Sequence, residues 1–258
     1  MQHRTIPLSQ TKISEILQSK DFVCDVTVLQ TVDSTNTEAK RLAATIDDDK
    51  PRLILAESQT NGKGRMGRSF YSPKSTGLYM SYMYTPKTDF ADSVTVTAAA
   101  SVAVVRAIET LTNLSPKIKW VNDIYIDSKK VCGILTEAVT GQTVKIIVGI
   151  GINITTEVFP DNVSKIATAL NTPIDRNTLA ATIIAELQKL ITELPKRTFL
   201  EEYREKSLVL GKEVVFYKND IDTYGTAIDI DQNGALIVQT SNGNITLNTG
   251  EISLRVRG

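Results

Sequence analysis

Apolar and polar residues alternate along the chain in patterns whose period changes several times. Short apolar runs bounded by turn residues predict strands, and apolar residues spaced three and four apart predict helices. The predicted strands before residue 208 are 26–29, 53–56, 78–84, 117–126, 131–139 and 143–154. The predicted helices are a short stripe near 13–17 and longer segments at about 33–44, 90–112 and 179–194. This mixture predicts an α/β body.

Boundary residues refine these elements. Thr35 and Glu38 have capping-box spacing at the start of the helix that Asp33 opens, and Pro195 ends the last helix. Polar turns at 127–129 and 140–142 predict antiparallel hairpins between neighbouring strands.

The pattern changes again from Gly211. Five short runs at 213–217, 223–230, 235–239, 245–248 and 252–256 alternate with Asn, Asp and Gly turns. Five strands in fewer than fifty residues predict a small β-barrel. We therefore expect a short N-terminal extension (1–24), a larger domain (25–207) and a small C-terminal domain (208–258).

Composition narrows the class of protein. The 258 residues include 29 Lys and Arg against 29 Asp and Glu, which argues against binding DNA or membranes by overall charge. His3 is the single histidine, so neither a Ser-His-Asp triad nor an HExxH zinc site can form. An enzyme of this composition must use electrostatics, an oxygen-ligated metal or a nucleophile from its substrate.

Three further features of the sequence bear on the cellular compartment of the protein. Cys24 and Cys132 form no CxxC pair, which suits a reducing compartment. The chain starts without the apolar stretch of a secretory signal, and polar residues interrupt the apolar segment 91–111. We expect a cytoplasmic protein.

The segment 62–68 concentrates three glycines and three cations, Lys63, Arg65 and Arg68. It contains GxGxxG, but the following residues 69–73 end in proline and oppose the helix that a dinucleotide-binding loop needs. Gly64 stands where a phosphate-binding P-loop has Ser or Thr. Two interpretations stay open on these residues alone: a loop that orders around an anion, and a solvated basic turn.

Extending the segment to 57–68, ESQTNGKGRMGR, gives a sequence that resembles the GRGRxGR loop of bacterial biotin protein ligases, with Lys63 replacing the first Arg. Further segments agree in the family's order: DSTNT at 33–37, KWVNDI at 119–124, KVCGILTE at 130–137, GIGIN at 149–153 and EISLR at 251–255. The resemblance implies an α+β fold of the class II aminoacyl-tRNA synthetase and biotin synthetase type. That fold has a mixed, mainly antiparallel sheet with helices on one face, followed by an SH3-like β-barrel.

The resemblance implies a two-step ligase reaction with biotin and ATP as substrates and Mg²⁺ accompanying the ATP. The biotin carboxylate attacks the α-phosphate to give biotinyl-5′-AMP, and a lysine of a biotin carboxyl carrier protein then takes the biotin. Both nucleophiles come from substrates, which agrees with the lack of a catalytic histidine.

The resemblance also implies roles for individual residues. The biotin-binding residues are Ser34, Thr35, Gln59, Gly62, Lys63, Gly64, Arg65, Lys130, Gly133 and Leu135. Those that bind ATP or the adenylate are Arg65, Arg68, Phe70, Asn122, Gly149, Gly151, Asn153 and Arg255. The catalytic cations are Lys130, Arg65, Arg68 and Lys119, and Asp123 is the candidate metal ligand.

Several of these positions have simpler interpretations, or depart from the family pattern. Ser34 and Thr35 also suit helix capping, and Lys130 at a strand start also suits solvent exposure. Lys63 lacks the bidentate fork of arginine, and Phe70 stands where the family often has Trp. Trp120 and Cys132 are interpreted as packing and core residues.

Alternatives from neighbouring classes are a lipoate–protein ligase and a non-catalytic module that senses biotin or a nucleotide. The motif at 33–37 comes too early for a preceding winged helix-turn-helix, so we expect a monofunctional ligase without specific DNA binding. The resemblance also implies that the protein can form a homodimer.

Overall fold

The computed structural model of the protein describes residues 6–87, 95–141, 143–218, 221–248 and 254–256. The helices are α1 (Gln10–Gln18), α2 (Thr35–Ala43), α4 (Val96–Leu111), α5 (Asp161–Ser164), α6 (Arg176–Thr192) and α7 (Phe199–Glu205). Two 3₁₀ turns, η1 (Arg65–Gly67) and η2 (Leu194–Lys196), accompany them.

Seven strands form the main sheet, in the spatial order β1-β2-β3-β7-β6-β5-β4. They are β1 (Asp25–Leu29), β2 (Arg52–Ala56), β3 (Gly77–Tyr84), β4 (Lys117–Lys119), β5 (Asp123–Ile126), β6 (Lys129–Val139) and β7 (Lys145–Asn153). Strands β1 and β2 pair in parallel, and every other neighbouring pair is antiparallel. The expected mixed, mainly antiparallel sheet is confirmed.

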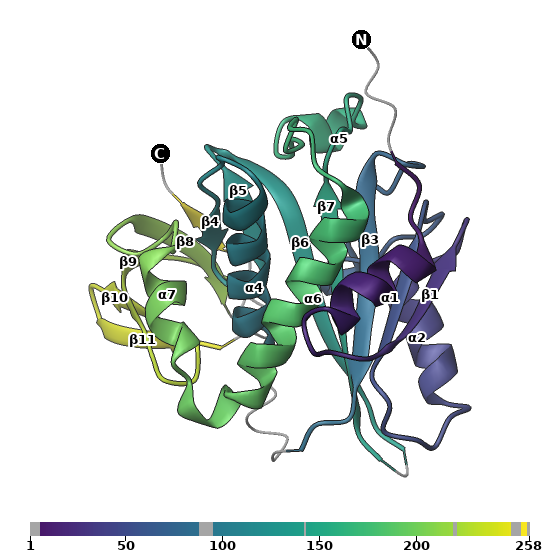
Figure 1. The fold of residues 1–258 in the computed structure, drawn as a ribbon. Coiled ribbons are helices and arrows are strands. Elements are labelled where there is room, and N and C mark those ends of the chain that lie inside the picture. The colour runs from purple at the N-terminus through teal and green to yellow at the C-terminus, as the bar shows by residue number, and fades with distance from the viewer. Residues whose placement is uncertain (1–5, 88–94, 142, 219–220, 249–253, 257–258) are drawn as a thin grey trace.

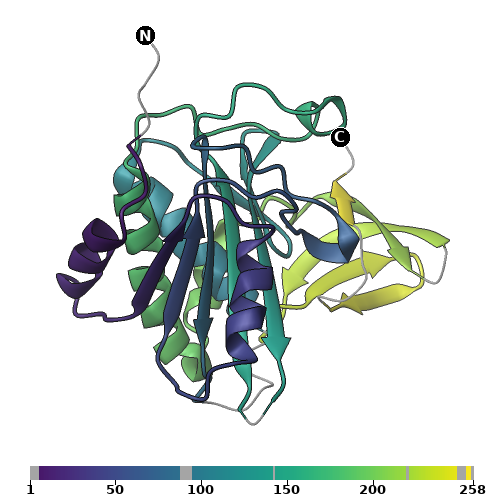
Figure 2. The same ribbon diagram turned by 90° about the vertical axis from the view of Figure 1, so that its right-hand side faces the viewer.

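The helices cover both faces of this sheet. Helices α1, α4 and α6 pack on one face (Figure 1), and α2 packs on the opposite face (Figure 2). Along β2, Leu53 and Leu55 belong to the large core under α4 and α6, whereas Ile54 packs beside Ala39 of α2. The expectation that helices cover one face is therefore wrong for α2. The physical reason is that the central strands are apolar at successive positions, so both faces need cover.

Two local predictions also need correction. The predicted strand 117–126 is divided by a turn at 120–122 into β4 and β5. The capping box between Thr35 and Glu38 does not form, because Ser34 is the N-cap and the Glu38 carboxylate accepts from Arg41 at 2.7 Å. Helix α6 begins at Arg176, before the apolar stripe, because the Asp175 carboxylate caps it through the Asn177 N–H at 3.1 Å.

The C-terminal strands form a separate antiparallel sheet in the order β11-β10-β9-β8-β12. They are β8 (Glu213–Lys218), β9 (Ile221–Ile230), β10 (Leu236–Thr240), β11 (Gly243–Leu247) and β12 (Leu254–Val256). This confirms the five predicted strands, although residues 252–253 lie outside the described residues. The turn between β9 and β10 contacts the larger domain, where Trp120 Nε1 donates to the Gly234 carbonyl at 3.0 Å.

A buried ion pair joins the start of α6 to the end of β2. Arg176 and Glu57 are 1% and 3% exposed, and Arg176 Nη1 lies 2.8 Å from Glu57 Oε2. Arg176 also donates to the carbonyls of Ile6 and Gly77, and Glu57 accepts from the Leu8 N–H at 2.7 Å. Burial acts to raise the pKa of the Glu57 carboxyl, but the Arg176 and Leu8 hydrogen bonds hold that pKa below its usual value.

Within the described ranges, no helix combines the length and the apolar character needed to cross a membrane.

We predict that Arg176→Met lowers the free energy of unfolding at pH 7 by about 3–5 kcal/mol, because it leaves the Glu57 carboxylate buried without its cation. Urea denaturation measures the difference. A matched control is Lys189→Met, which removes an exposed cation from the same helix and should cost much less.

The direction in which pH changes this difference in the free energy of unfolding can be worked out. A carboxyl with a depressed folded-state pKa stabilises above its unfolded pKa of about 4.3, and this contribution disappears as the pH falls through the folded-state value. The difference in the free energy of unfolding between wild type and Arg176→Met should therefore become smaller as the pH falls. A difference that grows in acid would contradict the proposed role of the pair.

Candidate active site

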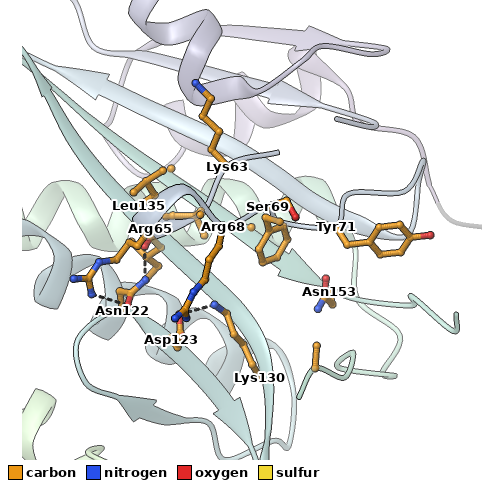
Figure 3. A pocket seen from close by; sticks show the side chains of 18 of the residues that line it. Lys63, Arg65, Arg68, Ser69, Tyr71, Asn122, Asp123, Lys130, Leu135 and Asn153 are labelled. Carbon is orange, nitrogen blue, oxygen red and sulfur yellow. Dashed lines mark hydrogen bonds and ion pairs between the residues drawn. The ribbon is translucent and has the colours of Figure 1, made fainter. Parts of the chain in front are cut away.

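A cavity of about 540 Å³ opens beside the main sheet. Its walls come from the N-terminus of α2, the segment 59–71, strands β5, β6 and β7, and the segment 159–167 (Figure 3). Segments far apart in the sequence therefore supply one site.

One part of the cavity lining consists of uncharged polar groups. Gln59 Oε1 accepts from the Thr35 N–H at 2.8 Å, and Gln59 Nε2 donates to the Ser72 hydroxyl at 2.8 Å. These bonds fix the orientation of the Gln59 amide and hold the first turn of α2 against it. Ser34 and Thr35 are buried, and the Ser34 side chain makes no capping bond within the described part of the chain.

Another part of the lining consists of cations. Arg65 Nη1 donates to Asn122 Oδ1 at 3.1 Å, and Lys130 Nζ lies 2.6 Å from Asp123 Oδ1. Figure 3 shows Arg68 extending toward this Lys130–Asp123 pair. Lys119 also lines the cavity, with its Nζ 5.5 Å from the centre of the Tyr125 ring.

Burial lowers the pKa of the Arg65 guanidinium; the positive charge of Arg68 acts in the same direction and Asp123 opposes it. Burial also raises the pKa of Tyr125 to about 12, with the Asp123 carboxylate adding to the effect. The cations of the lining therefore form a partly desolvated positive site, and an entering anion relieves the repulsion within it.

The glycine-cation segment forms a closed turn. The Gly64 N–H donates to the Arg68 carbonyl at 2.7 Å, and the Phe70 N–H donates to the Gly62 carbonyl at 2.8 Å. Met66 and Gly67 both have positive φ, at 55° and 72°, which directs the chain back on itself. The turn presents Arg65 and Arg68 to the cavity, whereas Lys63 extends away from Asp123 and Lys130 in Figure 3.

At three of the predicted glycines, a neighbouring side chain occupies the space that a Cβ atom would need. A Cβ atom on Gly151 would lie 2.6 Å from the Phe70 ring, and one on Gly133 would lie 2.9 Å from Lys130 Nζ. A Cβ atom on Gly149 would lie 2.0 Å from Asn36 Oδ1. The room beside Gly149 is therefore filled by the Asn36 amide rather than open to a nucleotide.

Asn153 ends β7 at the far wall of the cavity. Its Nδ2 donates to the Thr168 carbonyl at 3.1 Å, while its buried Oδ1 has no hydrogen-bond partner among the described residues. Apolar groups continue this wall, including Phe159, whose ring centre lies 6.3 Å from that of Tyr71. A flat ring bearing an N–H donor suits this part of the site.

The structure brings most of the predicted residues together. The lining includes Ser34, Thr35, Gln59, Lys63, Gly64, Arg65, Arg68, Phe70, Lys119, Asn122, Asp123, Lys130, Gly133, Leu135, Gly149, Gly151 and Asn153. Gly62 lies behind the lining, where a Cβ atom would meet the Phe70 carbonyl at 2.4 Å. Arg255 lies in β12, but its side chain is outside the described structure.

Sequence reasoning missed part of the lining. Asn36, Tyr125 and the apolar residues of 159–167 were not assigned, although Asn36 belongs to the quoted motif at 33–37. Cys132 is fully buried in the core as predicted. Trp120 packs as predicted and also lines the cavity.

The described part of the cavity lining offers one carboxylate to a metal ion. Asp123 is the single carboxylate among the described lining residues, and it is paired with Lys130. Across the described residues, no three His, Cys, Asp or Glu side chains are placed to hold a metal ion.

Comparisons with known proteins agree with this geometry. Residues 28–153 match the Biotin/lipoate A/B protein ligase family, and residues 209–255 match the Biotin protein ligase C terminal domain. The bifunctional ligase/repressor BirA of Bacillus spizizenii is 31% identical over 263 residues, which cover 96% of this chain and 79% of the relative. The biotin–[acetyl-CoA-carboxylase] ligase of Mycobacterium tuberculosis is 28% identical, and the match covers 85% of each chain.

Among solved structures, the biotin protein ligase from Aquifex aeolicus in complex with biotin and ATP superposes with a TM-score of 0.77 and 28% identity. The match covers 90% of this chain and 99% of that one. With this fold, this site and these relatives, the chain belongs to the biotin protein ligase family.

Proposed function

We propose that this protein activates biotin with ATP to form biotinyl-5′-AMP, and then transfers the biotin to a lysine of a carboxyl carrier protein. The observation that carries the proposal is the polarity of the cavity. The lining combines uncharged hydrogen-bonding groups at Ser34, Thr35 and Gln59 with cations at Arg65, Arg68 and Lys130. Biotin offers a matching pair of groups, a ureido ring and a carboxylate.

The first step needs no base from the protein. An aliphatic carboxylate is ionised at neutral pH, so its oxygen can attack the α-phosphorus of ATP directly. A new O–P bond forms, the bond between the α-phosphorus and its bridging oxygen breaks, and pyrophosphate leaves. Arg65, Arg68 and Lys130 hold the two anions together and offset the charge that develops at phosphorus.

In the second step, the neutral amine of the carrier lysine attacks the acyl carbon of the mixed anhydride. An amide bond forms, AMP leaves, and the amine releases a proton to solvent. The same cations stabilise the departing phosphate. The relative from Mycobacterium tuberculosis is named for acetyl-CoA carboxylase, which supports a biotin carboxyl carrier protein as the partner.

The nucleotide would occupy the apolar wall, with its adenine against Phe70 and its amino group donating to Asn153 Oδ1. Mg²⁺ would enter with the phosphates and be held mainly by them and by water, with Asp123 as the available protein oxygen. The placement of Lys63 supports a smaller role for its charge than for those of Arg65 and Arg68. The homodimer stays a prediction from the sequence.

We predict pyrophosphate exchange into ATP that depends on biotin and not on lipoate. Incubating the protein with ATP, labelled pyrophosphate and each acid in turn measures this directly. Exchange with lipoate alone would identify a lipoate ligase. Biotin binding without exchange would identify a non-catalytic module.

We predict that Arg65→Ala and Lys130→Ala each weaken formation or retention of the adenylate by at least about 1.5–3 kcal/mol, the usual cost of losing a charged hydrogen bond. This corresponds to roughly a ten- to hundredfold loss in the exchange rate. Lys189→Ala, an exposed cation on α6, is the matched control and should exchange normally. Wild-type rates in both site variants would overturn their assignment.

A further inference from the structure

A chain of buried hydrogen bonds links Thr35 to Ser81 and Asn36. The Ser81 hydroxyl oxygen lies 2.8 Å from Thr35 Oγ1 and 2.6 Å from Asn36 Oδ1. Asn36 Nδ2 donates to Glu137 Oε2 at 3.0 Å and to the Leu135 carbonyl at 3.2 Å. Thr35, Asn36 and Ser81 are 3%, 4% and 0% exposed, so water does not compete for these bonds.

The acceptors around Asn36 determine how its amide is oriented. The Leu135 carbonyl can only accept, and so can the Glu137 carboxylate, which is paired with Lys40 Nζ at 2.6 Å. The amide nitrogen must therefore face these two groups, and the amide oxygen must face Ser81.

This orientation determines where the hydroxyl hydrogens lie. Ser81 has one hydrogen, and the Asn36 amide oxygen can only accept, so Ser81 donates to Asn36. Thr35 then directs its own hydrogen inward, to the Ser81 oxygen at 2.8 Å or to Gln59 Oε1 at 3.2 Å. A lone pair of Thr35 Oγ1 is left for the cavity.

Gly149 makes this arrangement possible. It lies on β7 opposite Ser81 of β3, and a Cβ atom there would lie 2.0 Å from Asn36 Oδ1. Any side chain at 149 would displace the amide from Ser81. The glycine therefore serves the hydrogen-bond chain.

We propose that Asn36 is a positioning residue that, through Ser81, makes Thr35 a hydrogen-bond acceptor toward the cavity, so that the site selects a ligand N–H at this point. The inference rests on the proposed function, in which the ligand is biotin. The ureido ring of biotin offers two N–H groups, whereas the dithiolane ring of lipoate offers none. A site that is built to accept an N–H discriminates strongly against an analogue that lacks it.

The test measures affinity by titration calorimetry for biotin and for its two mono-N-methyl ureido derivatives, each of which lacks one N–H. We expect the wild-type protein to bind one derivative at least about tenfold more weakly than biotin. Ser81→Ala removes the nearer of the two inward acceptors of the Thr35 hydrogen and leaves Gln59 Oε1 at 3.2 Å. It should therefore weaken biotin about three- to tenfold and leave the affected derivative unchanged. The KM for ATP should not move.

Ser101→Ala is the matched control, because Ser101 is also fully buried but donates within α4 to the Thr97 carbonyl at 2.9 Å. It should leave all three affinities unchanged. Gly149→Ala provides a second variant if Ser81→Ala does not fold, and it should give the same selective loss for biotin.

Three results would overturn the inference while leaving the proposed function intact. They are equal wild-type affinity for biotin and both derivatives, an unchanged biotin affinity in Ser81→Ala, and an equal loss for all three ligands in that variant. A wild-type protein that binds no biotin at all would instead refute the proposed function.

Discussion

The buried Glu57–Arg176 pair is the contact on which the geometry of the site depends. Glu57 directly follows β2 and lies two residues before Gln59, while Arg176 begins the helix that covers the centre of the sheet. Their side chains also bind the backbone of Ile6, Leu8 and Gly77. The segment 59–71 leaves the sheet beside this ion pair. The pair therefore fixes the position from which the polar and cationic groups of the segment extend.

The cavity lining combines two kinds of recognition. Its uncharged groups depend on hydrogen bonds whose direction is determined by the half-buried Gln59 and the buried Asn36. Its cationic groups act through charge, with Arg65 held partly desolvated near Arg68 and Asp123. Neutral overall composition and a positive site are compatible because several cations line the cavity, whereas Asp123 is the single carboxylate among its described lining residues.

The features that could be predicted from the sequence are those that a local pattern of residues determines. Apolar periodicity located the strands of both sheets and the long helices, and the short motifs identified most of the cavity lining. What it missed depends on contacts between distant segments. Nothing local shows that α2 crosses to the other face, that Glu57 pairs with a residue 119 positions away, or that the room at Gly149 belongs to Asn36.

The contact between Phe70 and Gly151 has an evolutionary consequence. The ring of Phe70 fills the space that a Cβ atom on residue 151 would need, at 2.6 Å. Positions 70 and 151 therefore cannot diverge independently: a lineage that gains a side chain at 151 must first shrink or redirect the ring at 70. An aromatic ring at position 70 and a glycine at position 151 of β7 are therefore expected to be retained together.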